Sequence, residues 1–349
     1  MKQLIFIILL FPSFMLPTDI YDMKWSHVAL KQPGDWYGTA EAIAVAENVL
    51  LFQRNTGGWP KNISMHHKLS EKDRQEVLAD KAKKDDSTMD NDATYLESVF
   101  LAKVYNKTHT EKYKDAVINA LHYILEAQYP NGGWPQFYPL RKGYWSRITY
   151  NDDLMTNMLT ILQKIVEHDE LFSFVDDPAL VERCAAAFDR GLDCILKTQY
   201  RQNGKLTGWC AQHDEITLEP ALGRSYELPS LSGGEGAHIV QFLMEIKNPA
   251  PEVKEAIAAA VEWFEKVKIT GIKVESFTNV DGQTDRRVVS DPSAPPLWAR
   301  FYRLDDNRPI FSDRDGVMKF SLSEIGHERR NGYSWYTNAP QRVIDKYQK

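Results

Sequence analysis

A repeated helix-to-loop junction is the sequence feature that most restricts what this chain can fold into. It reads Gln53-Arg-Asn-Thr-Gly-Gly-Trp59-Pro, then Gln128-Tyr-Pro-Asn-Gly-Gly-Trp134-Pro, and in a longer form it runs from Gln199 to Trp209. Both intervals between its tryptophans are 75 residues. A period of that length suits two helices and a long loop, and it is too long for one hairpin of a thin solenoid.

Amphipathic stretches with apolar residues at helical spacing accompany the junctions. The expected helical pairs are 92–106 with 113–125, 152–168 with 181–196, and 235–247 with 253–264. A further stripe at 42–53 lacks an obvious partner. We therefore expect an all-α fold, an (α/α)3 toroid or barrel of about three helical-hairpin repeats of ~75 residues, with long loops and minor short strands at 272–277 and 287–289. The alternative is a coincidental spacing within an unrelated helical bundle.

The first residues resemble a secretory signal, because Lys2 precedes an apolar run that ends at Pro12. We expect residues 1–20 to be a signal peptide with an uncertain cleavage site, and residues 21–349 to form a single domain. The protein would then be secreted or periplasmic. The alternative is a buried N-terminal helix or strand.

Composition excludes several classes of protein. The 349 residues are 43% hydrophobic and carry a formal net charge of −6, which argues against a disordered chain and against a strongly basic nucleic-acid binder. Beyond residue 20 no apolar run is long enough to span a membrane. No HExxH, CxxC, P-loop, GxGxxG or GxSxG motif occurs, so zinc, nucleotide and α/β-hydrolase chemistry lack support.

Acidic clusters stand at the start of two of the predicted helices. Asp90 and Asp92 lie at the start of 92–106, and Asp152 and Asp153 lie at the start of 152–168. Asp is a common N-cap, so capping is the ordinary explanation. Equivalent clusters in successive repeats would, however, meet at one end of a toroid, where carboxylates suit a hard cation such as calcium.

The loop after Trp209 is the densest in candidates. His213 beside Asp214 fits either an acid/base pair or a structural histidine, and Arg224 lies between two prolines. The repeat tryptophans fit either core residues or sugar platforms. These residues alone leave each choice open.

Several long motifs in this chain resemble those of polysaccharide lyase family 10 pectate lyases, over roughly residues 30 to 345. They are Asp90-Asn-Asp-Ala, Thr149-Tyr-Asn-Asp-Asp, Trp209-Cys-Ala-Gln-His-Asp, Arg224-Ser-Tyr-Glu-Leu-Pro-Ser-Leu-Ser-Gly-Gly-Glu, Arg308-Pro-Ile-Phe-Ser-Asp-Arg-Asp-Gly and Arg330-Asn-Gly-Tyr-Ser-Trp-Tyr. The resemblance implies a Ca2+-dependent pectate lyase. Its substrate would be de-esterified homogalacturonan (polygalacturonate), cleaved by β-elimination to 4,5-unsaturated oligogalacturonates.

The resemblance also implies roles for individual residues. Arg224 would be the base that removes the C5 proton, and Arg314 would grip a substrate carboxylate. Asp90 and Asp152 would hold calcium and substrate, with Asp92 and Asp153 as weaker metal candidates. We add Trp209 and Tyr226 as candidate sugar contacts, and we expect a monomer.

Physical chemistry is consistent with this interpretation, because elimination adds charge to a carboxylate that a cation and an arginine fork would stabilise. An arginine base requires a lowered pKa, so an alkaline pH optimum is expected. Two alternatives remain. One is an inverting toroid glycoside hydrolase that uses Asp90 and Asp152, and the other is a noncatalytic pectin-binding protein.

Overall fold

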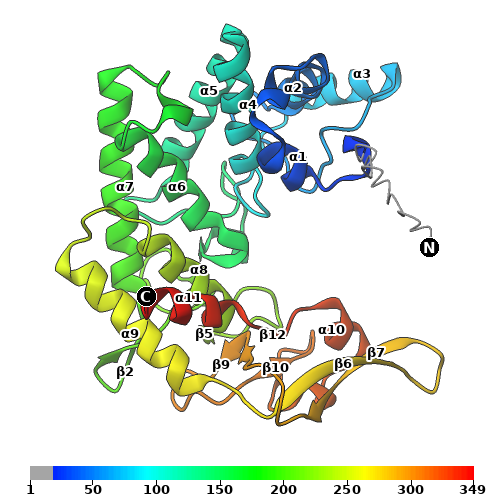
Figure 1. Cartoon of the computed structure of the whole chain (residues 1–349), viewed down its shortest axis with the longest axis vertical. Coiled ribbons are helices and arrows are strands. Elements are labelled where there is room, and N and C mark those ends of the chain that lie inside the picture. Colours follow the sequence, from blue (N-terminus) through cyan, green and yellow to red (C-terminus); the bar gives the residue numbers. More distant parts are fainter. Residues whose placement is uncertain (1–18) are drawn as a thin grey trace, which may run out of the picture.

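The computed structural model describes residues 19–349, and helices dominate it. The α-helices are α1 Trp25–Lys31, α2 Ala40–Phe52, α3 Glu71–Ala79, α4 Tyr95–Thr108, α5 Glu111–Ala127, α6 Leu154–Val166, α7 Pro178–Thr198, α8 Gly233–Leu243, α9 Pro251–Val267, α10 His327–Gly332 and α11 Ala339–Tyr347. In Figure 1, α1 to α7 occupy one end of the long axis, and the C-terminal part with most of the strands occupies the other.

Strands are short and pair locally. The longest form an antiparallel hairpin, β6 Ile272–Thr278 and β7 Thr284–Ser290, where the sequence predicted small strands. The others span two residues each: β1 Ile148–Thr149, β2 Arg201–Gln202, β3 Lys205–Leu206, β4 Gln212–His213, β5 Leu231–Ser232, β8 Trp298–Ala299, β9 Phe301–Tyr302, β10 Phe311–Ser312, β11 Met318–Lys319 and β12 Tyr336–Thr337.

The three predicted helical pairs are confirmed, as α4 with α5, α6 with α7, and α8 with α9. Helix α2, which had no evident partner in the sequence, packs against α4 and α5. Near the C-terminus α11 packs against α8 and α9. The fold is the expected (α/α) toroid, with helical hairpins as its repeating unit.

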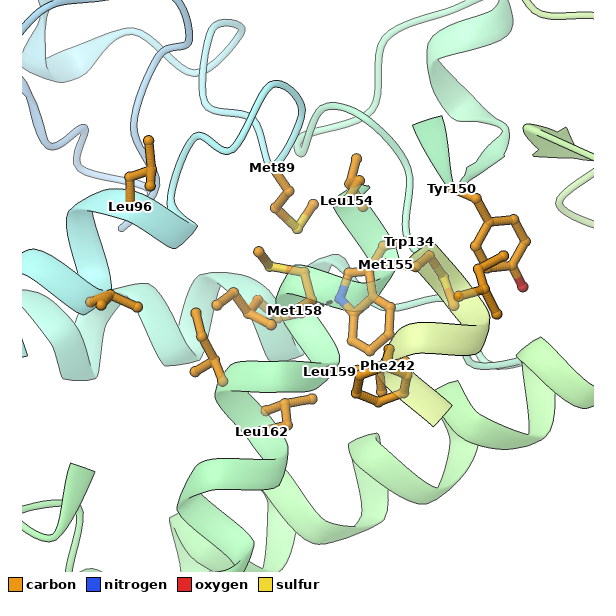
Figure 2. Close-up of a cluster of buried hydrophobic side chains, with 14 of the residues drawn as sticks. Met89, Leu96, Trp134, Tyr150, Leu154, Met155, Met158, Leu159, Leu162 and Phe242 are labelled. Atoms are coloured by element: carbon orange, nitrogen blue, oxygen red, sulfur yellow. Dashed lines mark hydrogen bonds between the residues drawn. The ribbon is translucent and has the colours of Figure 1, made fainter. Parts of the chain in front are cut away.

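Each repeat tryptophan is a core residue that fixes its loop to the preceding helix. Trp59, Trp134 and Trp209 are fully buried, and each indole Nε1 donates a 2.8 Å hydrogen bond to a carbonyl of the preceding helix. Figure 2 shows Trp134 among Met155, Met158 and Phe242. The tryptophans therefore set the position at which each loop leaves the helical wall.

A glutamine at the end of three consecutive outer helices connects each one to the next. Gln53 Nε2 donates to the Ala116 carbonyl of α5 at 2.8 Å, and Gln128 Nε2 donates to the Ala187 carbonyl of α7 at 2.8 Å. Gln199 repeats the contact with Ala256 of α9 at 2.9 Å. Because the acceptors are backbone atoms, these connections do not depend on the side chains of the next helix.

The predicted signal peptide falls almost entirely on residues 1–18, which lie outside the described residues, so export stays a prediction. Within residues 19–349 no helix is both long and apolar enough to cross a bilayer.

Glu97 is a buried carboxyl group between α1 and α4, and it gives a stability prediction. Its Oε1 accepts from Trp25 Nε1 at 2.7 Å, and burial raises its pKa from an ordinary 4.5 to about 7. Between these values the unfolded chain ionises first, so stability falls as pH rises, by on the order of 2–3 kcal/mol at pH 8. We expect Glu97→Gln to melt a few degrees higher than the wild type at pH 8 and at a similar temperature at pH 4.5, by circular dichroism.

Glu47 is the matched control, because its surroundings shift the pKa of its carboxyl group in the opposite direction. It accepts hydrogen bonds from Lys112 and Tyr113, and these outweigh burial and lower its pKa. Glu47→Gln should therefore lose stability at neutral pH, where Glu97→Gln gains it. A Glu97→Gln variant that is less stable than the wild type at pH 8 would show that the carboxylate is needed for folding.

Candidate functional site

Two acidic turns with a left-handed backbone begin the inner helices α4 and α6. Asn91 and Asp92 have φ of 53° and 61° before α4, and Asp152 and Asp153 have φ of 51° and 59° before α6. Non-glycine residues pay for this conformation, Asn and Asp less than others, because their short side chains can hydrogen-bond locally. Such strain persists mainly where a function requires it, and it occurs here at equivalent positions of two successive repeats.

The acidic turns border a polar cavity of about 620 Å3. Asp92, Asp152 and Asp153 line it from the helix starts, and Glu235 and Arg300 line it from the C-terminal half. The sequence prediction that the two clusters meet is thereby confirmed. A cavity with this lining suits a polar, charged ligand.

Burial of carboxylates is the main electrostatic property of this cavity, and repulsion between them adds to it. Burial raises the pKa of Asp152 to about 6; the Asp90 charge adds to this shift, and the Arg300 charge opposes it. Burial likewise raises the pKa of Asp92, and the hydrogen bond from Asn157 counteracts this only in part. A cation bound here would relieve this repulsion.

Asp90 lies beneath the cavity lining, and its exposed fraction is 3%. Its Oδ2 accepts a hydrogen bond from Lys61 Nζ, while its Oδ1 is buried without a hydrogen-bond partner among the described residues. Leaving a buried carboxylate oxygen unpaired is costly. The unpaired oxygen marks Asp90 as a candidate cation ligand, although Asp90 does not itself line the cavity.

The acidic residues do not form a complete metal site by themselves. No group of three or more His, Cys, Asp or Glu side chains within residues 19–349 is arranged to hold an ion. Asp153 is already paired, through Oδ1 and the Nδ1 atom of His238 at 2.5 Å. Asp90 and Asp152 fit calcium by their chemistry, but its usual six to eight oxygen ligands would have to be completed by substrate and water.

Arg224 lies near enough to the acidic turns for its charge to lower the pKa of Asp152. Its guanidinium binds the Glu227 carboxylate, with Nε to Oε1 at 2.9 Å. Burial alone would lower the pKa of Arg224, but the hydrogen bond and charge of Glu227 outweigh burial and hold the pKa above its ordinary value. This direction is opposite to the one that the sequence analysis expected for a base, because the nearest charged partner is an anion.

Arg314 and Tyr226 belong to a group of stacked side chains beside Arg224. The guanidinium carbons of Arg224, Arg314 and Arg329 lie 5.1, 5.7 and 4.6 Å from the centre of the Tyr226 ring. Arg314 is exposed and pairs with Glu328 at 3.0 Å. Tyr226 is only 3% exposed, and its ring packs against these guanidinium groups. The ring therefore has no free face for the predicted contact with a sugar.

The predicted contact between Trp209 and the sugar chain is wrong for this structure. The side chain is fully buried, and its Nε1 is bonded to the Ile195 carbonyl. His213 is also buried, and desolvation lowers its pKa to about 4. Its Nδ1 lies 2.8 Å from the Leu218 carbonyl, which fits the structural explanation for this histidine.

The sequence did not predict the residues that form ion pairs with the charged side chains of the site. Arg300 donates to Glu235 at 2.5 Å and to Asn151, the residue before Asp152, at 2.8 Å. Lys61 and Glu227 were also not predicted. Lys61 and Arg300 carry no periodic or motif signal for their partners, whereas Glu227 lies three residues after Arg224 in the same motif.

Comparisons with known proteins agree with this fold. The model of the pectic acid lyase family matches residues 53–344. A family 10 polysaccharide lyase from Cellvibrio cellulosa is 34% identical in sequence, and the match covers 93% of this chain and 94% of that chain with a TM-score of 0.79.

A mutant of the Cellvibrio cellulosa lyase in complex with trigalacturonic acid is also 34% identical, over 90% of this chain and 97% of that chain, with a TM-score of 0.78. No curated protein sequence matched. The family match covers most of the chain and the structural match nearly all of it. The chain therefore belongs to the pectic acid lyase family and is a pectate lyase.

Proposed function

We propose that this pectate lyase cleaves de-esterified homogalacturonan by calcium-dependent β-elimination, with Arg224 as the base. The observation that carries the proposal is that the acidic turns of α4 and α6 border one cavity, with Arg224 near enough for its charge to lower the pKa of Asp152. The solved relative with bound trigalacturonic acid supports the choice of substrate. We also propose that the protein is exported, on the basis of the sequence pattern in residues 1–20.

Asp90 and Asp152 would hold calcium through the crowded carboxylates described above, together with oxygens of the substrate. When bound, calcium would neutralise the carboxylate of the sugar that loses its proton. The guanidinium of Arg300 faces the same cavity and can orient the anionic chain. Substrate binding and metal binding are then coupled, because neither is complete without the other.

Arg224 would take the proton from C5, the carbon next to the sugar carboxylate. The electron pair left on C5 forms the C4–C5 double bond, and the glycosidic oxygen leaves C4 with the bonding electrons and takes a proton from water. Glu227 stays in place when Arg224 turns to the substrate, because Tyr333 donates to Glu227 Oε1 at 2.7 Å. The raised pKa of Arg224 predicts an alkaline pH optimum, since only the unprotonated side chain accepts a proton.

The test is the ultraviolet absorbance of the product on polygalacturonate, with calcium and with a chelator. We expect absorbance to rise with calcium and to stay flat with the chelator, because only elimination creates a double bond conjugated to a carboxylate. Reducing sugar released without absorbance would indicate the hydrolase alternative. Polymer binding without product in excess calcium would indicate a noncatalytic protein.

A further inference from the structure

A second pocket adjoins the reaction cavity on the side of the β6–β7 hairpin. It has a volume of about 270 Å3 and shares Ser334 and Tyr336 with the reaction cavity. The residues that complete its lining come from the hairpin and the C-terminal segment: Val274, Ser276, Arg286, Leu322, Arg330, Tyr333 and Trp335. Figure 1 shows the hairpin extending from the part of the molecule that contains β12.

The charge of this pocket is opposite to that of the reaction cavity. Its lining contains two arginines and no carboxylate, whereas the reaction cavity contains four carboxylates. Arg330 is neutralised by Asp285, with Nε to Oδ1 and Nη2 to Oδ2 both at 2.7 Å. The net positive charge of the pocket therefore comes from Arg286.

Arg286 lacks the partner that the neighbouring arginines have. Its guanidinium makes one long contact, from Nη1 to the Tyr333 carbonyl at 3.5 Å, and no ion pair with any carboxylate of residues 19–349. In contrast, Arg224, Arg300, Arg314, Arg329 and Arg330 each pair with an acidic side chain. A half-buried arginine without a counter-ion is well placed to bind a carboxylate from outside the chain.

The register of the hairpin points Arg286 into the pocket. Arg286 stands opposite Ser276, and Val288 stands opposite Val274, so these side chains share one face of the hairpin. Arg287 stands opposite Glu275 on the other face and pairs with it at 2.8 Å. Arg286 therefore faces the pocket without a counter-ion, whereas the adjacent Arg287 is neutralised by Glu275 on the opposite face of the hairpin.

Tyr333 connects the pocket to the reacting groups. Its carbonyl receives the contact from Arg286, while its hydroxyl donates to the Glu227 carboxylate that holds Arg224. Hydroxyl groups of Ser276, Ser334 and Tyr336 in the lining suit the hydroxyls of a sugar. A polymer that passes Arg224 can therefore continue into this pocket.

We propose that this pocket is an outer subsite in which Arg286 binds the carboxylate of a galacturonate residue away from the cleaved bond. The inference rests on the proposed function for the identity of the polymer. Chains too short to reach Arg286 gain nothing from it, whereas longer chains gain one charge-assisted contact. Chain-length preference is then set in part by the hairpin.

The experiment measures kcat/KM on trigalacturonate and on octagalacturonate, by product absorbance, for the wild type, Arg286→Ala and Arg287→Ala. We expect the ratio of octamer to trimer to fall roughly fivefold to tenfold in Arg286→Ala. Arg287→Ala should keep the wild-type ratio. An unchanged ratio in Arg286→Ala, or an equal fall in Arg287→Ala, would overturn the proposal.

Two further measurements separate the subsite from folding and from the reaction. Arg286→Gln keeps a donor to the Tyr333 carbonyl without the charge, so a fall in the ratio for this variant excludes a purely structural effect. Calorimetry with octagalacturonate and calcium, in an Arg224→Ala background, tests binding without turnover, and adding Arg286→Ala should weaken binding more than adding Arg287→Ala. If the wild type makes no unsaturated product, the proposed function fails, and calorimetry still decides the subsite.

Discussion

Arg224→Ala should lose on the order of 10³-fold in kcat on polygalacturonate, as measured by product absorbance at saturating calcium, because general-base catalysis typically contributes 10²–10⁴-fold. The fold should survive the change. Glu227 keeps its hydrogen bonds from Tyr333 and from the backbone N of residue 224, so the carboxylate is not left without a donor. Circular dichroism and thermal melting check this point. An Arg224→Ala enzyme with near wild-type turnover would rule out the mechanism.

Glu227→Gln tests whether Arg224 acts by losing its proton. The carboxylate holds the pKa of Arg224 above its ordinary value, so its removal lowers that pKa. A base must be deprotonated, and the acid limb of the pH–rate profile should therefore move to lower pH in Glu227→Gln. If Arg224 acted only as a fixed cation, the limb would not move in that direction.

Asp152→Asn should lower kcat/KM on the order of 10²-fold, a loss typical of removing one charge-stabilising group from an active site. The same variant should need more calcium for half-maximal activity, measured by calcium titration of the absorbance assay. The wild type should also bind calcium more weakly as the pH falls through about 6, where the Asp152 carboxylate takes up a proton.

Asp153→Asn is the matched control for Asp152. It changes the adjacent residue of the same strained turn, but that carboxylate is already bonded to His238. We expect a smaller rise in the calcium requirement than in Asp152→Asn. Equal effects would show that the turn as a whole, and not the Asp152 carboxylate, controls metal binding.

The sequence predicted the helical wall because the wall is made by local patterns. Apolar spacing and the recurring junction gave the three hairpins, and both depend on neighbours within one repeat. The fourth tryptophan of the series was missed. Trp298 donates to the Phe264 carbonyl at 2.8 Å as its counterparts do, but the β6–β7 hairpin lengthens the interval and hides the period.

Only those site residues that belong to a recognisable motif could be predicted from the sequence. Acidic turns at equivalent repeat positions pointed to the residues that meet at the cavity. Lys61 and Arg300 come from segments distant in sequence from the acidic residues that they pair with, so the sequence does not show that they lie close together. Glu227 lies three residues after Arg224, but the motif alone does not show that the two side chains form an ion pair. The sequence analysis expected a lowered pKa for Arg224, whereas the ion pair with Glu227 raises it.

The glutamines that connect successive outer helices have a consequence for evolution and engineering. They bind backbone carbonyls, so these contacts do not depend on which side chains the neighbouring helices carry. The loops at the active end, including the β6–β7 hairpin, can then change in length and sequence while the frame is retained. Libraries that vary these loops alone are a direct route to lyases for other acidic polysaccharides.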